Sequence, residues 1–192
     1  MGRLIVVSFS TVDGVVEDPD GSGGTPFGGW AMRHGREAIA GDKFRLGPVL
    51  TDGTLLFGRR TWEHFATLWP TRDDEFARAM NAARKAVVTS SALDERAWSH
   101  SFPVDEPLGW VRRELGSHDV AVVGSLSVVA ALADAGLVDE YRLLYFPTVA
   151  GSGRGLFPGP TALRTTSSEP VGPGTLVTLE PEPAGVGAAA TA

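Results

Sequence analysis

The chain has 192 residues, 43% of them hydrophobic and 21% charged, which are ordinary proportions for one soluble domain that buries a core. Its formal net charge of −6 excludes a general electrostatic attraction to nucleic acid or to acidic membranes. It contains no cysteine, which removes disulfides, thiolate metal sites and cysteine nucleophiles together.

The first apolar run, residues 4–7, is far shorter than a signal peptide or a membrane span requires. We therefore expect a cytoplasmic protein without a membrane segment. Residues 1–180 are expected to form one domain, because no linker or internal repeat interrupts them. Residues 181–192 are rich in alanine, glycine and proline and nearly uncharged, so we expect a mobile tail outside the fold.

Buried strands are predicted where β-branched and apolar residues run together. These runs lie at 4–9, 54–57, 85–89, 119–123 and 141–149. Apolar residues at helical spacing predict helices at 30–44, from Arg59 onward, at 72–83, from Pro107 and from Leu126. A loop rich in glycine and proline is expected at 18–29, and two closing strands are expected at 163–166 and 175–179.

The alternation of strands and helices predicts an α/β fold, with a mostly parallel central sheet and helices on both faces. The last third of the chain loses helices and gains strands, which predicts a C-terminal antiparallel hairpin. A parallel sheet brings the carboxyl ends of its strands to one edge, where ligands of open α/β sheets collect.

One such strand end is Gly58-Arg59-Arg60-Thr61, which follows a buried strand and opens a helix. Free amides and the helix dipole favour an anion at a helix N-terminus, and two arginines beside them can clamp a phosphate. The alternative is a solvated arginine pair beside an ordinary turn, and periodicity alone does not separate the two.

Two further strand ends repeat this logic. Gly124-Ser125-Leu126 joins a strand to a helix, where glycine permits close approach of a ligand and Ser125 can cap the helix and donate to a phosphate. Thr89-Ser90-Ser91 offers hydroxyl groups at another strand end. Each segment alone is more typical of a simple turn, and neither has the Gly-x-Gly-x-x-Gly fingerprint of a Rossmann domain.

Together these segments resemble the dihydrofolate reductase-like superfamily, and within it the bacterial proteins related to the reductase domain of riboflavin biosynthesis. The resemblance covers residues 3–180. It rests on 8–14 (SFSTVDG), 56–63 (LFGRRTWE), 85–91 (KAVVTSS) and 122–125 (VVGS), and above all on 135–143 (AGLVDEYRL) and 146–157 (FPTVAGSGRGLF).

The resemblance implies a dihydrofolate reductase-like fold that binds NADPH at these strand ends, without a metal. The arginines would read the phosphates, the hydroxyls after residue 88 would line the adenosine end, and residues 124–126 would pass under the pyrophosphate. The implied cofactor-binding residues are Gly58, Arg59, Arg60, Thr61, Thr89, Ser90, Ser91, Gly124, Ser125 and Leu126.

The same resemblance places the substrate between the first strand, the helix that begins at Trp30 and the strand that holds Tyr145. Asp13 is the preferred catalytic group, because the riboflavin-type relatives carry an Asp-Gly pair beside the substrate, and Glu37 is the second candidate acid. Asp13 can equally be a simple turn residue. Nearby basic groups that a phosphoribosyl substrate would need are Arg33, His34 and Arg36, and the implied substrate-binding residues are Ser10, Trp30, Tyr145 and Phe146.

These patterns lead to the expectation of an NADPH-dependent reductase that transfers a hydride to a small conjugated heterocycle or carbonyl compound, of pterin, pyrimidine or secondary-metabolite type. The alternative is a non-catalytic module that keeps the NADPH or pterin pocket. A nucleotide hydrolase has little support, because the sequence shows no P-loop and no acidic metal cluster. The expected partners are a small-molecule substrate and a second copy of the chain in a homodimer.

Overall fold

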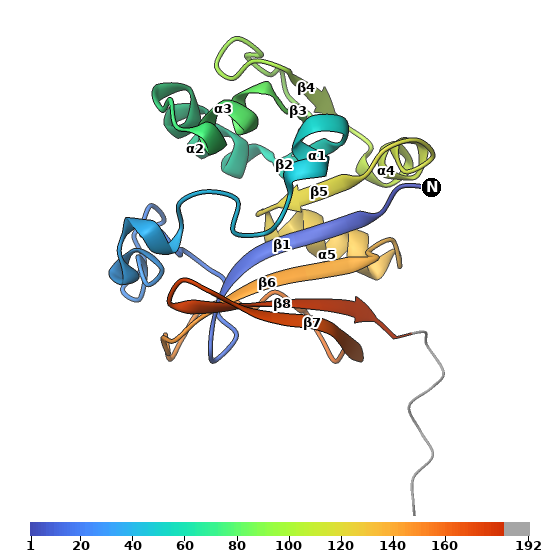
Figure 1. The fold of residues 1–192 in the computed structure, drawn as a ribbon. Coiled ribbons are helices and arrows are strands. Elements are labelled where there is room, and N and C mark those ends of the chain that lie inside the picture. Colours follow the sequence, from blue (N-terminus) through green and yellow to red (C-terminus); the bar gives the residue numbers. More distant parts are fainter. Residues whose placement is uncertain (183–192) are drawn as a thin grey trace, which may run out of the picture.

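A computed structural model describes residues 1–182 of the protein. Eight strands form one sheet in the order β4-β3-β2-β5-β1-β6-β8-β7, which Figure 1 shows as a single layer. The strands are β1 (Leu4–Thr11), β2 (Thr54–Gly58), β3 (Arg84–Val88), β4 (Ser101–Val104), β5 (Val120–Val123), β6 (Glu140–Phe146), β7 (Leu163–Val171) and β8 (Gly174–Pro181).

The strands from β4 to β6 in this order pair in parallel, whereas β8 pairs antiparallel with both β6 and β7. β1 lies between β5 and β6, with Leu4 opposite Val120 and Thr11 opposite Phe146. The predicted α/β fold, with a mostly parallel sheet and a C-terminal antiparallel hairpin, is confirmed. Because the parallel strands run the same way, the segments that follow them meet at one carboxyl edge.

Helices cover both faces of this sheet (Figure 1). α4 and α5 bury residues such as Leu132 against Leu4 of β1, and α1, α2 and α3 bury residues such as Trp62 against Ile5 on the opposite face. Alternate residues of β1 therefore enter different cores, as the period of a strand requires. The helices are α1 (Gly47–Asp52), α2 (Arg59–Leu68), α3 (Glu75–Ala82), α4 (Pro107–Glu114) and α5 (Leu126–Asp134).

The segment 30–44 is not the helix that its sequence predicts. It forms two short 3-10 turns, η1 (Met32–His34) and η2 (Arg36–Ala38). Gly35 and Gly41 adopt φ values of +84° and +74°, a conformation that ends a right-handed helix. The prediction is therefore wrong, and the segment instead packs as an irregular cover over the buried ends of β1 and β6.

Other element boundaries differ from the sequence pattern for local reasons. β4 is not predicted because it is short and contains Pro103, which an edge strand tolerates since it needs no amide there. α1 is likewise missed. α3 begins at Glu75 rather than at residue 72, because the Asp74 carboxylate accepts the Ala77 amide at 3.0 Å and caps the helix.

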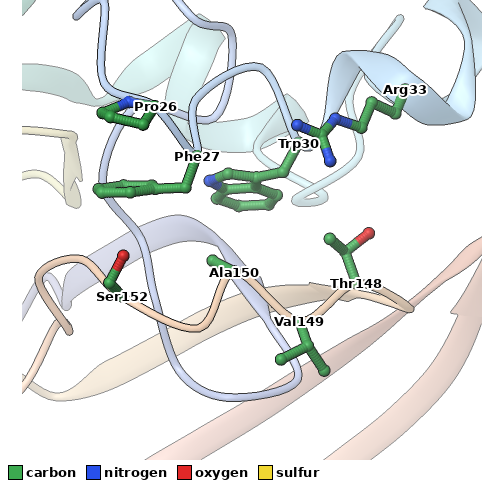
Figure 2. Close-up of a pocket in the computed structure, with 8 residues that line it drawn as sticks. All are labelled: Pro26, Phe27, Trp30, Arg33, Thr148, Val149, Ala150 and Ser152. Carbon is green, nitrogen blue, oxygen red and sulfur yellow. The ribbon is translucent and has the colours of Figure 1, made fainter.

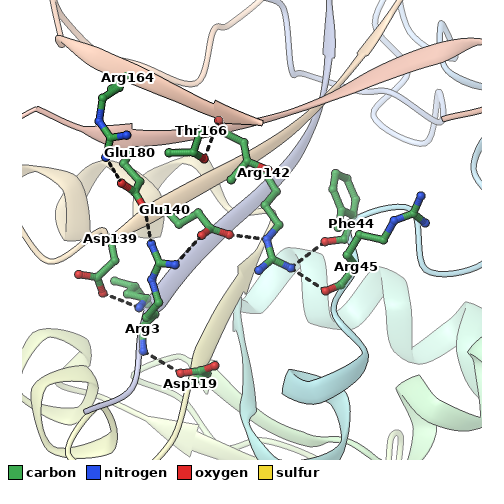
Figure 3. Close-up of polar contacts among 12 residues, drawn as sticks. Arg3, Phe44, Arg45, Asp119, Asp139, Glu140, Arg142, Arg164, Thr166 and Glu180 are labelled. Atoms are coloured by element: carbon green, nitrogen blue, oxygen red, sulfur yellow. Dashed lines mark hydrogen bonds and ion pairs between the residues drawn. The ribbon is translucent and has the colours of Figure 1, made fainter. Parts of the chain in front are cut away.

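A network of charged side chains joins the C-terminal hairpin to β1 and β6 (Figure 3). Arg3, just before β1, pairs with the buried Glu140 at 2.9 Å and with Glu180 of β8 at 2.8 Å. Glu140 also accepts from Arg142, whose guanidinium donates to the Phe44 carbonyl at 2.9 Å. The shared carboxylates thus fix the hairpin, the central strands and the segment before α1 relative to one another.

The described chain ends shortly after the hairpin. Pro181, which the sequence assigns to a tail, is the last residue of β8. The predicted tail from residue 183 onward lies outside the described residues. Within residues 1–182, no helix has both the length and the apolar character needed to cross a membrane.

Candidate functional site

The structure brings together the three strand ends singled out in the sequence. β3, β2 and β5 are neighbours in the sheet, and they end at Val88, Gly58 and Val123. The segments 89–91 and 124–126 therefore lie on either side of the start of α2 along the carboxyl edge. That these segments bind a cofactor stays a prediction.

Two glycines allow the backbones at this edge to approach each other closely. A Cβ atom on Gly58 would lie 2.1 Å from the Ser125 Oγ, and one on Gly124 would lie 2.9 Å from the Thr61 Cγ2. Gly124 also has a φ of +69°, in the left-handed region that favours glycine. The first turns of α2 and α5 are thus in contact across the end of the sheet.

Two helix N-termini converge at this contact. α2 starts directly after Gly58 and α5 directly after Ser125, and neither of these two residues caps its helix with a side-chain hydrogen bond. The free amides and the positive dipole ends of both helices favour an anionic ligand here. The expectation that Ser125 caps α5 is wrong, because the residue has a φ of +63° and its hydroxyl lies 3.4 Å from that of Ser127.

The two arginines of α2 have different surroundings. The Arg59 guanidinium donates to Glu63 at 2.6 Å, to the Ser91 hydroxyl at 3.2 Å and to the Ala92 carbonyl at 2.8 Å. Arg60 is exposed, and its side chain makes no hydrogen bond or ion pair with any other residue between 1 and 182. Arg59 therefore ties α2 to the segment after β3, while the charge of Arg60 is available to a ligand.

The hydroxyl groups after β3 also differ in whether they have hydrogen-bond partners. The Thr89 Oγ1 lies 3.4 Å from the Arg59 Nη1 and accepts the Ser91 amide at 3.2 Å. Ser90 is exposed, and within the described part of the chain its hydroxyl has no hydrogen-bond partner. Thr89 and Ser91 shape this turn, which leaves Ser90 as the hydroxyl best able to contact a ligand.

A cavity of about 250 Å³ lies beside the first turns of α5. Leu126 and Ala130 form its helical wall, and the opposite wall belongs to the loop that follows β6. The lining residues from that loop are Arg154, Gly155, Leu156 and Pro158.

A larger cavity of about 350 Å³ lies farther along the same edge, next to the end of β6. Figure 2 shows the Phe27 and Trp30 rings on one side of it and the loop 148–152 on the other. Trp30 is the one member of the predicted substrate-binding set that lines it. The full lining is Pro26, Phe27, Trp30, Arg33, Thr148, Val149, Ala150 and Ser152.

Trp30 is a fixed wall of this cavity and not a mobile stacking group. Trp30 and Phe146 are both fully buried, and their rings meet edge to face with centroids 5.8 Å apart. The Trp30 indole N–H donates to the Glu17 carbonyl at 2.9 Å. Phe146 supports Trp30 from beneath and does not itself line the cavity.

Ser10 and Tyr145 also stand back from the cavity. Ser10 is buried, and its hydroxyl donates to the Thr11 carbonyl at 3.0 Å. Tyr145 packs against the core under α4 and α5, where burial raises its pKa, whereas Phe146 belongs to the core on the other face. These two neighbouring aromatic residues thus point to opposite faces of the sheet, as the period of a strand requires.

Asp13 lies in the turn after β1 and holds the loop that follows β6. Its carboxylate accepts the Thr11 hydroxyl at 2.5 Å, the Gly151 amide at 2.8 Å and the Ala150 amide at 3.1 Å. These hydrogen bonds, that of Thr11 foremost, lower the pKa of Asp13 to about 2. Asp13 is therefore ionised at neutral pH and has no proton to give, so this geometry favours a positioning role.

Glu37 is exposed on η2, and its carboxylate has no polar partner within residues 1–182. It lines neither of the two cavities. Over the same residues, no group of three His, Asp or Glu side chains is placed to hold a metal ion. The edge therefore offers amides, hydroxyls and guanidinium groups, and a catalytic role of Asp13 or Glu37 stays a prediction.

Comparison with known protein families shows to which family the chain belongs. The family model described as "RibD C-terminal domain" matches residues 3–177. The chain belongs to the RibD C-terminal domain family. A relative in Bacillus subtilis (strain 168), the uncharacterized protein YyaP, is 27% identical over 111 residues, which make up 54% of this chain and 58% of that protein.

Solved structures share the fold of this RibD C-terminal domain. A protein assigned to riboflavin biosynthesis in Shewanella sp. PV-4 matches with a TM-score of 0.70 at 17% identity, over 94% of this chain and 99% of that one. The diaminohydroxyphosphoribosylaminopyrimidine deaminase/5-amino-6-(5-phosphoribosylamino)uracil reductase of Thermotoga maritima matches with a TM-score of 0.59 at 15% identity, over 94% of this chain and 56% of that one. The chain thus spans little more than half the length of YyaP and of the Thermotoga protein.

Sequence reasoning misses most of the lining of the 350 Å³ cavity of this RibD C-terminal domain. Phe27 lies in the loop 18–29, whose composition predicts a loop but does not single out one residue. Residues 148–152 lie inside the motif 146–157, but a motif does not say which side chains face a cavity. Arg33 could be anticipated from the sequence, since it belongs to the basic group that follows Trp30.

We expect the substitution Asp13→Asn to loosen the loop at Ala150 and Gly151. A carboxylate holds both amides with charge-assisted hydrogen bonds, whereas an asparagine side chain offers one neutral acceptor oxygen. Amide hydrogen exchange at these two residues, followed by NMR, should become ~10-fold faster or more. The exposed Asp52→Asn is the matched control, and unchanged exchange in Asp13→Asn would show that other contacts hold the loop.

Proposed function

We propose that the chain is an NADPH-dependent reductase that transfers a hydride to a small conjugated heterocyclic or carbonyl compound. The observation that carries the proposal is the meeting of two helix N-termini beside Arg60, with a cavity next in line along the same edge. Membership of the RibD C-terminal domain family supports it, as does the reductase named in the Thermotoga maritima neighbour.

The residues at this edge suit a long, phosphate-bearing cofactor. Because Gly58 and Gly124 have no side chain, the first turns of α2 and α5 can pack together, and both helices present their first amides at the same point of the edge. The guanidinium of Arg60 suits the 2′-phosphate that distinguishes NADPH from NADH. When bound, NADPH supplies the hydride, and the chain contributes binding and orientation.

The cavity next to β6 is the proposed substrate site. Phe27 and Trp30 give it an apolar wall, and Asp13 keeps the opposite loop in place through the Ala150 and Gly151 amides. Since β1 lies between β5 and β6, a ring bound near the end of β1 would lie between the anion site and this cavity. The order of sites along the edge therefore matches a cofactor that extends toward its substrate.

The test uses the purified chain. NADPH binding is measured by calorimetry, and NADPH oxidation is followed by absorbance with a panel of pterins, pyrimidines and conjugated carbonyl compounds. We expect binding of NADPH and oxidation with at least one member of the panel. Absence of NADPH binding would refute the proposal, and light scattering on the same sample tests the proposed homodimer.

A second candidate function is a non-catalytic module that binds NADPH without turnover. The surroundings of the two candidate acids favour it, because Asp13 is ionised and accepts three hydrogen bonds, while Glu37 is exposed and lines neither cavity. Tight NADPH binding without oxidation by any compound of the panel would support this alternative.

We expect Arg60→Ala to weaken NADPH binding by ~10- to 100-fold and to leave NADH binding nearly unchanged, because one charge-assisted contact to the 2′-phosphate is lost. Arg59→Ala should weaken both cofactors alike, since Arg59 braces the segment after β3. Arg112→Ala, on the exposed end of α4, is the control. Equal loss of both cofactors in Arg60→Ala would show that Arg60 does not read the 2′-phosphate.

A further inference from the structure

The cavity beside β6 lies between two aromatic side chains and a loop. Phe27 and Trp30 lie on one side of it, and Val149 and Ala150 lie on the other (Figure 2). Trp30 is fully buried and its indole N–H is bonded, so this wall is rigid. The volume of about 350 Å³ falls in the range of small-molecule sites. The partly exposed Phe27 ring beside the buried Trp30 can pack against a conjugated ring system.

Arg33 supplies the one charge among the residues that line this cavity. Figure 2 shows its side chain reaching back toward Trp30. Arg33 is exposed on η1, and within residues 1–182 its guanidinium has no hydrogen bond and no acidic partner. The Thr148 hydroxyl below it is bonded to the His34 Nε2 at 2.7 Å, so Arg33 is the free polar group at this end of the cavity.

Carboxylates already occupy three amides of the glycine-rich loop after β6, which weakens it as a phosphate cradle. Amides in such loops commonly hold phosphate oxygens. Here the Ala150 and Gly151 amides donate to Asp13 at 3.1 and 2.8 Å. The Arg154 amide donates to Glu17 at 3.2 Å, and the Arg154 guanidinium pairs with the same carboxylate at 2.7 Å. A doubly charged anion bound at this loop would be repelled by the carboxylates of Asp13 and Glu17.

We infer that this cavity selects a flat conjugated ring that carries a single carboxylate, which Arg33 holds, over the same ring carrying a phosphonate. A carboxylate matches one guanidinium with two parallel hydrogen bonds and needs no further cation. A doubly charged group needs more positive charge than the lining provides. The inference rests on the proposed function only in taking this cavity as the substrate site.

The test is the binding of matched probes to the full chain in the absence of NADPH. Pterin, pyrimidine and quinoline rings are each used as the carboxylate, the carboxamide and the phosphonate, and dissociation constants are measured by ligand-observed NMR. The carboxylate should bind ~10- to 100-fold more tightly than the carboxamide of the same ring, which is what one charge-assisted pair contributes.

Arg33→Ala should remove this preference, and Arg33→Lys should retain part of it because the charge remains. Arg36→Ala is the matched control, since Arg36 is also exposed on a 3-10 turn but lines no cavity described here. Tighter binding of the phosphonate, equal binding of carboxylate and carboxamide, or no binding of any carboxylate would each overturn the inference.

These outcomes are separate from those of the proposed function. A chain that shows the Arg33-dependent preference but does not bind NADPH would refute the reductase and leave the selectivity of the cavity standing. NADPH oxidation by a chain without any carboxylate preference would refute the selectivity alone.

Discussion

Gly124→Ala is expected to weaken NADPH binding by ~100-fold or more while the chain stays folded, because the turn under the proposed pyrophosphate site must move. The new Cβ atom would lie 2.9 Å from the Thr61 Cγ2 and 3.1 Å from its Oγ1. The φ of +69° at this residue adds the cost of placing an alanine in the left-handed region, ~1–2 kcal/mol. Relaxation of either strain shifts the first turn of α2 or α5 away from the ligand.

Gly136→Ala is the matched control for this experiment. Gly136 has a similar φ of +63°, but a Cβ atom there meets nothing within 4 Å. Both variants therefore carry the backbone cost, and Gly124→Ala alone disturbs the contact between the two helices. Calorimetry with NADPH should show a large loss for Gly124→Ala and normal affinity for Gly136→Ala. Normal affinity in both variants would move the pyrophosphate site away from Gly124.

The second large effect is expected on stability, at Lys85 in β3. This side chain is fully buried. Its ammonium group donates to the carbonyls of Asn81 and Ser99 at 3.0 Å and to that of Ala83 at 2.5 Å. The ammonium nitrogen also lies 4.6 Å from the centre of the Trp98 ring. Burial lowers the pKa of Lys85 to about 8, so it remains charged at neutral pH. Through these hydrogen bonds the ammonium group caps the C-terminal end of α3 and links it to the segment before β4.

Lys85→Met keeps the length of the side chain and removes all three hydrogen bonds. We expect it to lower the free energy of unfolding by ~2–4 kcal/mol, because the unpaired carbonyls outweigh the relief of a buried charge. Lys43→Met, at a partly exposed lysine, should change it by less than ~0.5 kcal/mol. Urea unfolding at pH 7 measures both variants. A Lys85→Met protein as stable as the parent would show that the cost of burying the charge cancels the hydrogen bonds.

The sheet and the place of the candidate site follow from the sequence for a simple reason. Buried parallel strands are continuous apolar runs, so the runs at residues 4–9 and 54–57 reveal both the strands and where they end. Once the strand ends are known, the topology of a parallel sheet brings Arg59, Ser91 and Gly124 to one edge without further information.

The irregular segment 30–44 and the partners of single side chains could not be predicted, because they depend on contacts between segments that are distant in the sequence. The cover formed by 30–44 is irregular because Gly35 and Gly41 take left-handed conformations, although the spacing of its apolar residues is helical. Asp13 reads as a turn residue, and its bonds to Ala150 and Gly151 join positions more than a hundred residues apart. Even within the arginine pair of α2, the sequence cannot say that Arg59 is engaged and Arg60 is free.

The position of β1 also sets the order in which the protein can assemble. β1 is synthesised before the other strands of this sheet, yet its two edges are covered by β5 and β6, from Leu4 opposite Val120 to Thr11 opposite Phe146. Pairings between such distant segments form slowly, and apolar strands with open edges associate with other chains. A nascent chain released before Val120 would therefore present its central strand uncovered on both sides, which makes such early termination products prone to aggregate.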